Sequence, residues 1–350
     1  MALSKTDTTA LKGLAILFVL LGHMNYLDAS GAWGVHIFLI LSGFGLEISY
    51  QKNGLNEYWK KRIVKVFLPY ELAILLALTI ERIVFLHHDY LEVAASVLGL
   101  DFGFNIDHSM WYVSYLFLLY GEFYIWKKYG TNRMTKTLLP VMFILFNFVL
   151  SICDKFFHLA IWSPTAQVWL YAFDFFVGIV LVHISADKYK KIYDLLVLAM
   201  ILYFVVRYNH THFKLDMLLF TLSAAAVTIG LGQKLKIGRA SFLLKLGECS
   251  YFIYLTEGHL LRWKGQFLCW IQNENLRNVT VLVLCMILGF TFQRIFDVLY
   301  SRMGGVRNQF VEDNAIGNMH RKQYLNEEIY IFNVSDAICD YCLSNCIMAQ

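Results

Sequence analysis

The sequence predicts an all-α, polytopic membrane protein with about ten transmembrane helices and both termini in the cytoplasm. Composition is the first observation: 58% of the 350 residues are hydrophobic and only 16% are charged, whereas a soluble domain usually carries about 25% charged residues. The second is a series of apolar runs that are long enough to cross a bilayer. The third is the placement of Lys and Arg in alternate gaps between those runs.

The apolar runs divide the chain into a membrane domain and a tail. Residues 1–300 are expected to form the transmembrane domain, and residues 301–350 a cytoplasmic tail that is partly disordered. The expected limits of the helices are 11–27, 33–50, 66–86, 109–126, 138–157, 166–183, 192–208, 214–232, 243–262 and 278–300.

The loop charges predict the orientation of these helices. The gaps 28–32 and 87–108 contain no Lys or Arg, whereas the gaps after even-numbered runs are rich in cations. Because cytoplasmic loops carry the excess of cations, the cation-rich gaps are expected on the cytoplasmic side. A net charge of +4 on a chain of this length gives no argument for nucleic acid.

The first apolar run carries a cation near one end and an imidazole near the other. Lys12 and His23 are eleven residues apart, which places them within about 20° of the same helix face and about 16 Å apart along the axis. Ionisable groups inside an apolar span usually face the bundle interior or a wet cavity. We therefore expect this helix to line a channel with Lys12 at its cytoplasmic mouth and His23 deep inside.

A carboxylate is expected at the depth of that imidazole. Glu257 lies about 18 Å along its helix from Lys245, close in depth to His23, while Glu81 also falls in the outer half. A carboxylate beside His23 would orient the ring and raise its basicity, as general-base catalysis requires. The alternative is structural: His23 as a core histidine on a backbone carbonyl, and Arg294 paired with Glu47 or Glu122.

Two further segments have both a plain and a functional interpretation. The basic segment 58–65 contains Lys61, Arg62 and Lys65, and is either a positive-inside anchor or a phosphate site. Trp111 and Tyr112 open an expected helix on the outer side, and are either part of an interfacial aromatic belt or a surface on which a sugar stacks.

The cysteines give little evidence for a metal. Cys339, Cys342 and Cys346 lie close together in the tail without a clear fourth ligand. On the cytoplasmic side they are expected to be reduced thiols, and no metal is expected in the site.

Five segments, in order and with matching spacing, resemble the acyltransferase 3 family of integral-membrane proteins, which O-acylate cell-surface polysaccharides and other molecules. Lys12 to His23 resembles the family's Arg-x10-His motif, and 34–44 resembles its Gly-Val-Asp-x-Phe-Phe-x-x-Ser-Gly-Phe segment. The remaining three matches are Tyr58–Pro69, Trp111–Ser114 and Ser250–Leu255.

The chain departs from the family pattern at several positions. Lys12 stands where the family has arginine, which keeps the charge but loses the bidentate fork. His36 stands where aspartate is usual, Thr8 and Thr9 stand where an aspartate usually precedes the first motif, and Glu257 replaces a common histidine.

The resemblance implies a multi-pass O-acyltransferase of the bacterial cytoplasmic membrane. It implies an acyl-CoA donor, most simply acetyl-CoA, with its phosphates near Lys12, Lys61, Arg62 and Lys65, and a carbohydrate acceptor. His23 and Glu257 would be catalytic, and Trp111, Tyr112 and His36 would bind the acceptor. The alternative is a proton-coupled transporter that uses His23, Glu257 and Glu81 as a relay, although the chain shows no repeated halves.

Overall fold

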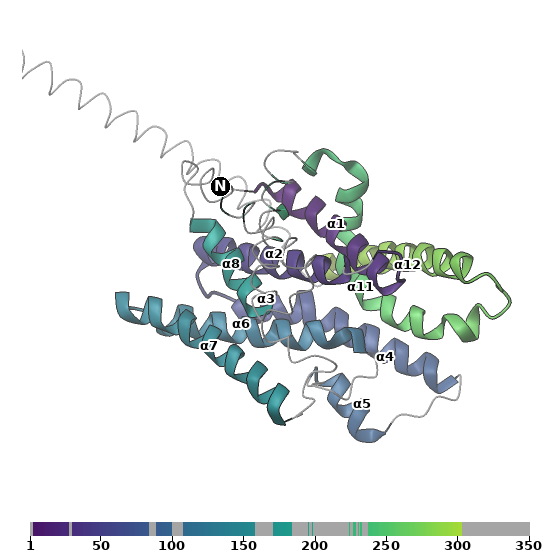
Figure 1. Cartoon of the computed structure of the whole chain (residues 1–350), viewed down its shortest axis with the longest axis horizontal. Helices are drawn as coiled ribbons and strands as arrows, with labels where there is room; N and C mark the ends of the chain where they lie inside the picture. The colour runs from purple at the N-terminus through teal and green to yellow at the C-terminus, as the bar shows by residue number, and fades with distance from the viewer. Residues whose placement is uncertain are drawn as a thin grey trace, which may run out of the picture. The chain divides into compact units, whose positions relative to one another are not determined.

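The described part of the protein is built from helices. The computed structural model describes residues 3–27, 30–83, 89–99, 108–157, 171–183 and 237–302, with a few single positions between 195 and 232. These ranges contain no strand (Figure 1). The helices are α1 (Lys5–His23), α2 (Ser30–Asn53), α3 (Tyr58–Arg62), α4 (Leu68–Ile83), α5 (Tyr90–Val97), α6 (Trp111–Tyr129), α7 (Arg133–Phe157), α8 (Ala172–His183), α11 (Ser241–Phe267) and α12 (Glu274–Arg302).

The prediction of an all-α, multi-pass membrane protein is confirmed. Among the described residues, four segments are long and apolar enough to cross a membrane: Ser30–Asn53, Tyr58–Arg82, Arg133–Cys153 and Glu274–Ser301. The expected runs 192–208 and 214–232 lie almost entirely outside the described residues. The total of ten helices and the cytoplasmic position of both termini stay predictions.

Contacts between Cα atoms divide the chain into the units Met1–Gln293 and Arg294–Gln350. The division falls inside α12, a few residues before the expected boundary at 300, which itself stays a prediction. All contacts described below lie within the first unit.

Helices α1 and α11 approach each other at a pair of glycines. A Cβ atom at Gly13 would lie 2.1 Å from the carbonyl oxygen of Leu243, and one at Gly247 would lie 1.8 Å from that of Thr9. Small residues of this kind let helix backbones pack closely in a membrane, where lipid removes the hydrophobic force between helices. The two glycines therefore fix the level at which α1 meets α11.

A second close approach joins α2 and α8. A Cβ atom at Gly43 would lie 2.0 Å from the carbonyl oxygen of Phe175, and one at Gly178 the same distance from that of Ile40. His36 contacts Asp174 before this crossing and Glu47 contacts His183 after it. Because residue numbers rise together along both helices, α2 and α8 run parallel, as the second and sixth expected spans would.

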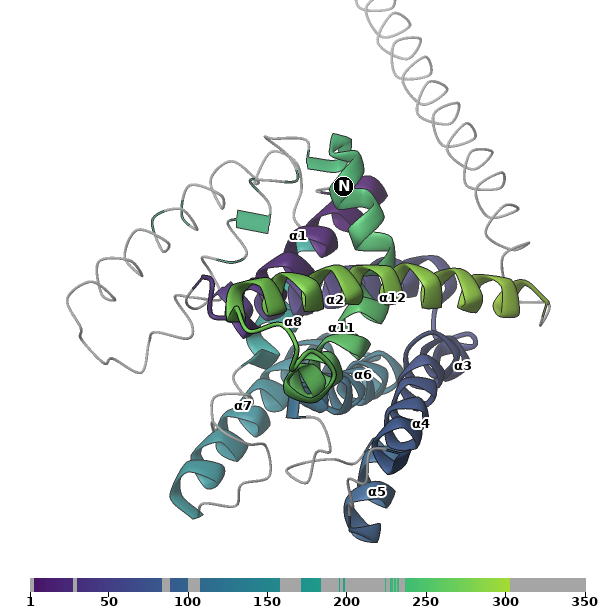
Figure 2. The same cartoon turned by 90° about the vertical axis from the view of Figure 1, so that its right-hand side faces the viewer.

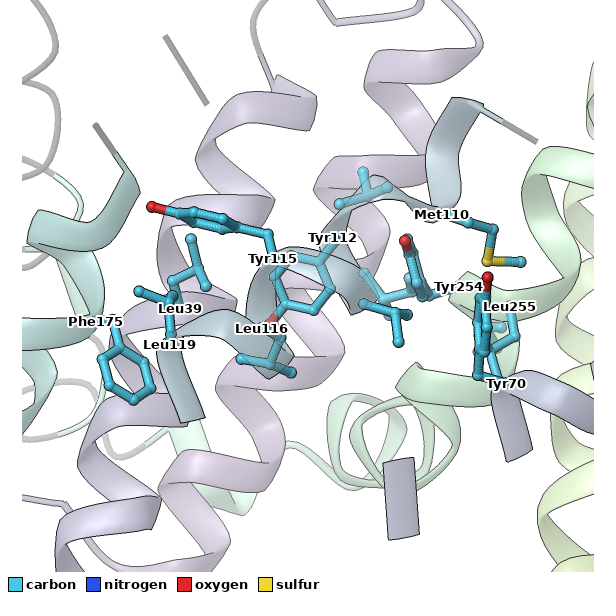
Figure 3. Close-up of a cluster of buried hydrophobic side chains, with 14 of the residues drawn as sticks. Leu39, Tyr70, Met110, Tyr112, Tyr115, Leu116, Leu119, Phe175, Tyr254 and Leu255 are labelled. Carbon is cyan, nitrogen blue, oxygen red and sulfur yellow. The ribbon is translucent and has the colours of Figure 1, made fainter. Parts of the chain in front are cut away.

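Aromatic side chains fill the interior between α2, α4, α6, α8 and α11. Figure 3 shows Tyr112 of α6 and Tyr254 of α11 among them, with Leu39 and Phe175 towards one end and Tyr70 towards the other. Tyr70, Tyr115 and Phe175 have no exposed surface.

The connection between α3 and α4 is a turn of π-helix at Ile63–Phe67. Pro69 follows directly, and a proline in a helix lacks an N–H and clashes with the carbonyl four residues earlier. A π-turn widens the helix locally and is a recognised response to such an interruption. As far as Ile83, where the described residues end, the expected span 66–86 is therefore helical, with an irregular start.

Helix α5 was not predicted from the sequence. It follows α4 and packs back along it, with the Tyr70 hydroxyl donating to the carbonyl of Ser96 at 2.6 Å (Figures 1 and 2). Gly99, at a φ of +63°, ends the segment against the ring of Phe67. At eight residues, α5 is too short for a search based on membrane-spanning length.

The glycine crossing gives a direct test of helix packing. We expect Gly247→Ala to lower the stability of the purified protein by about 1–3 kcal/mol, since the new methyl group would meet the backbone of α1. The unfolding midpoint in detergent measures this. Gly265→Ala on the same helix, where an added Cβ meets nothing within 4 Å, is the matched control; equal midpoints for the two variants would contradict the packing described.

Candidate active site

His23 and Glu257 form the pair that the sequence placed at one depth. The His23 Nδ1 atom lies 2.5 Å from a Glu257 carboxylate oxygen, although the residues are 234 positions apart. The Glu257 side chain has no exposed surface, whereas 43% of the His23 side chain is exposed. The pair is thus a buried carboxylate that holds an accessible imidazole.

The glycine crossing accounts for this pairing. Gly13 lies ten residues before His23 on α1, and Gly247 lies ten residues before Glu257 on α11. Because the glycines touch and both helices rise about 1.5 Å per residue in the same direction, the two side chains reach the same level about 15 Å further on.

The structure corrects the expected depth of His23 within its helix. The expected helix 11–27 continues beyond His23, but α1 ends at His23 and the chain turns through Asn25, which has a φ of +57°. An αL residue directly after a helix is a common terminator. His23 therefore occupies the helix end, where its ring is more open than a mid-helix residue's would be.

The geometry suits proton transfer at His23. A carboxylate at Nδ1 fixes the ring orientation, so that Nε2 is the atom at which a substrate proton would be taken up, and it stabilises the imidazolium that results. The same division of labour between a buried acid and a histidine operates in the Ser-His-Asp triad.

The predicted phosphate residues lie close to one another. Lys65 is within electrostatic range of Arg62, Lys61, Lys12 and also Lys5, so that α1 and the turn before α4 supply one group of cations. Lys5 had not been assigned to this group from the sequence. We call these five residues the cationic cluster.

Three of the five cations in the cluster form no salt bridge with an acidic side chain of the described residues. Within the described ranges, no carboxylate forms a salt bridge with Lys12, Lys61 or Arg62, whereas the neighbouring Lys60 pairs with Glu57 at 2.9 Å. The Arg62 guanidinium lies over the Tyr58 ring, 4.5 Å from its centroid. Like charges held together in this way favour a polyanionic ligand.

Two of the three predicted acceptor residues, Trp111 and His36, contact the same ring, that of Tyr171. Trp111 stacks on Tyr171 with centroids 5.7 Å apart, and His36 meets Tyr171 edge-on at 4.8 Å. Tyr112 contacts Tyr254 at 5.6 Å, and Tyr254 lies one helical turn before Glu257. Tyr112 is thus buried in the aromatic interior, where Trp111 packs against the core while partly exposed, and the acceptor-binding role of both stays a prediction.

His36 has a different environment from the one expected. Its side chain is fully buried, with Nδ1 2.7 Å from a carboxylate oxygen of Asp174, which is also fully buried. A contact with the acceptor would therefore run through Tyr171, and the binding role of His36 stays a prediction.

A model for the acyltransferase domain family matches residues 7–294. The chain belongs to the acyltransferase 3 family. No curated protein and no solved structure matches it. Membership makes the protein an acyltransferase and accounts for the order and spacing of the five motif segments.

Other buried carboxylates of the acyltransferase have partners that the sequence did not indicate. Glu47 lies 2.7 Å from the Lys127 ammonium and 2.9 Å from His183 Nε2. Glu122 accepts a hydrogen bond from Asn147 at 2.8 Å. These partners come from α6, α7 and α8, and the expected pairing of Glu47 or Glu122 with Arg294 stays a prediction.

Glu81 joins α4 to the outer part of α11. It accepts hydrogen bonds from the Arg262 guanidinium and, at 2.9 Å, from the indole N–H of Trp263. Arg262 and Glu257 lie on different faces of α11, because five residues turn a helix by about 140° beyond one full turn. The relay of His23, Glu257 and Glu81 stays a prediction.

The structure describes four of the seven cysteines. Cys339, Cys342 and Cys346 lie outside the described residues. Cys153, Cys249, Cys269 and Cys285 are free thiols, and the described ranges contain no group of His, Cys, Asp and Glu that could hold a metal ion.

The role of Glu257 can be tested through the pH dependence of the acyltransferase. We expect Glu257→Gln to keep a hydrogen-bonding side chain but to lower the maximal rate by about tenfold or more, since a charge-assisted bond to the imidazolium is lost. The acidic limb of the pH–rate profile should also move to lower pH, because the carboxylate no longer favours the protonated ring. An unchanged pH–rate profile would argue against the assigned role.

Proposed function

We propose that the protein is an O-acyltransferase that moves an acyl group, in the simplest case acetyl, from cytoplasmic acyl-CoA to a hydroxyl of a cell-surface or lipid-linked carbohydrate. The cytoplasmic membrane is its proposed location. The observation that carries the proposal is a single helix, α1, with the cationic cluster at one end and the His23–Glu257 pair at the other.

The cationic cluster supports a coenzyme A donor. Coenzyme A joins several phosphates to a distant thioester through the pantetheine arm, so it needs a cationic site separated from the reacting group. Lys12 and His23 are about 16 Å apart along α1. Phosphates held near Lys12, Lys61, Arg62 and Lys65 would leave the thioester to extend along α1 towards His23.

The transfer step assigns one proton to His23. Nε2 takes the proton of the acceptor hydroxyl as its oxygen attacks the thioester carbonyl, the carbon–sulfur bond breaks, and the departing thiolate takes that proton from the imidazolium. In the two-step alternative, Nε2 attacks the thioester carbonyl and the carbon–sulfur bond breaks, which releases the coenzyme A thiolate. The acceptor hydroxyl then attacks the acyl group, the carbon–nitrogen bond breaks, and the hydroxyl proton neutralises the thiolate. Glu257 has the same task in both, which is to hold the ring and to balance its positive charge.

The aromatic side chains beside the pair support a carbohydrate acceptor. Trp111 and Tyr112 offer ring faces and a hydroxyl at the level of the catalytic pair, and sugars present both C–H faces and hydroxyls. His36 and Asp174 would hold Tyr171 in place beneath Trp111.

Acetyl transfer in isolated membranes tests the reaction class and the central residue together. We expect label from radioactive acetyl-CoA to reach surface polysaccharide with the wild-type protein, and transfer to be abolished in His23→Ala with an unchanged amount of protein in the membrane. Label transfer that persists in His23→Ala would remove His23 from the mechanism.

The donor site is tested by two substitutions of one cation. Lys12→Ala should raise the KM for acetyl-CoA by about tenfold, the value of one hydrogen bond to a charged group of about 1.5 kcal/mol. Lys12→Arg should stay close to wild type, since arginine also binds phosphate. Equal losses in the two variants would indicate that Lys12 acts through packing rather than charge.

A further inference from the structure

Tyr251 links the helix of Glu257 to the turn that carries the cations. Its hydroxyl donates a hydrogen bond of 2.7 Å to the carbonyl oxygen of Val66, which lies 185 positions away. Val66 belongs to the π-turn Ile63–Phe67. Tyr251 itself lies six residues before Glu257 on α11, a rise of about 9 Å.

The π-turn determines where the cations point. Removing one residue from a helical turn rotates every side chain before it by about 100° relative to those after it. Lys61 and Arg62 precede the π-turn directly and Lys65 lies within it. If the turn relaxed to α-helix, these cations would no longer share the position they now occupy near Lys12.

Two features keep the π-turn from relaxing. Pro69 cannot donate the N–H that a regular α-helix would offer to the carbonyl of Lys65. Tyr251 supplies an outside donor to the neighbouring carbonyl of Val66, and thereby ties the turn to α11 rather than only to α4.

We infer that Tyr251 is a positioning residue: its bond to Val66 sets the register between the cations that bind the donor and the helix that carries Glu257. This inference rests on the proposed function. Because of the bond between Tyr251 and Val66, a donor whose phosphates are bound by the cationic cluster would also have its thioester placed beside His23. Tyr251 would not touch the reacting atoms.

The test compares two tyrosines that each donate to a backbone carbonyl. Tyr251→Phe removes the bond to Val66. Tyr70→Phe removes a bond of the same kind, to the carbonyl of Ser96, on the helix that directly follows the π-turn. Both variants delete one hydroxyl and keep the ring. The measurements are the KM for acetyl-CoA, the KM for the acceptor, and the Kd of coenzyme A for the full-length protein in detergent.

We expect Tyr251→Phe to raise the KM for acetyl-CoA and the Kd of coenzyme A by about five- to tenfold, and to leave the KM for the acceptor unchanged. Tyr70→Phe should leave both donor constants within twofold of wild type. Unchanged donor constants in Tyr251→Phe, or equal shifts in the two variants, would overturn the inference.

A second variant keeps the inference testable if Tyr251→Phe is poorly folded. Pro69→Ala restores the missing N–H and favours a regular helix, so it should weaken donor binding in the same direction; tight binding by a well-folded Pro69→Ala would count against the inference. Measurements on the wild-type protein separate a failure of the Tyr251 inference from a failure of the proposed function. Wild-type protein that neither binds coenzyme A nor transfers acetyl would defeat the proposed function itself.

Discussion

The contact between Gly13 and Gly247 is the constraint on which the site depends. In a bilayer, helices gain little from burying apolar side chains against each other, so close backbone packing at small residues sets their position. Here the packing fixes the level of two parallel helices, and everything further along them follows from that level. His23 meets Glu257 because each lies ten residues beyond its glycine. The pair proposed to be catalytic is thus positioned by glycines that lie ten residues away from it on each helix.

The pair α2 and α8 repeats this device with a different outcome. Its glycine crossing lies between two histidine–carboxylate contacts, His36–Asp174 on one side and Glu47–His183 on the other. Ionisable groups within a membrane span are costly without a partner, so any slip of one helix along the other would leave charges unpaired. The glycines set the distance between the helices, and the polar pairs specify their register.

Most of the described helices could be predicted from apolar length, and the pairing of His23 with Glu257 from depth along two helices. Neither property identifies which helices are neighbours. For that reason the contacts of Glu47 with Lys127 and His183, and of Glu122 with Asn147, were not expected. Apolar length also does not predict irregular elements: α5 is too short, and the π-turn before Pro69 has no hydrophobic pattern of its own.

His23, His36 and His183 each contact a buried carboxylate, but the three histidines differ in exposure and in the other partners of that carboxylate. His36 also faces a buried acid, but its ring has no exposed surface, whereas 43% of the His23 side chain is exposed. His183 is 56% exposed beside the buried Glu47, so access alone does not separate it from His23. The Glu47 carboxylate, however, also pairs with the Lys127 ammonium, which already balances its charge. The Glu257 carboxylate lies 2.5 Å from His23 Nδ1, so it would stabilise a positive charge that formed on the exposed His23 ring.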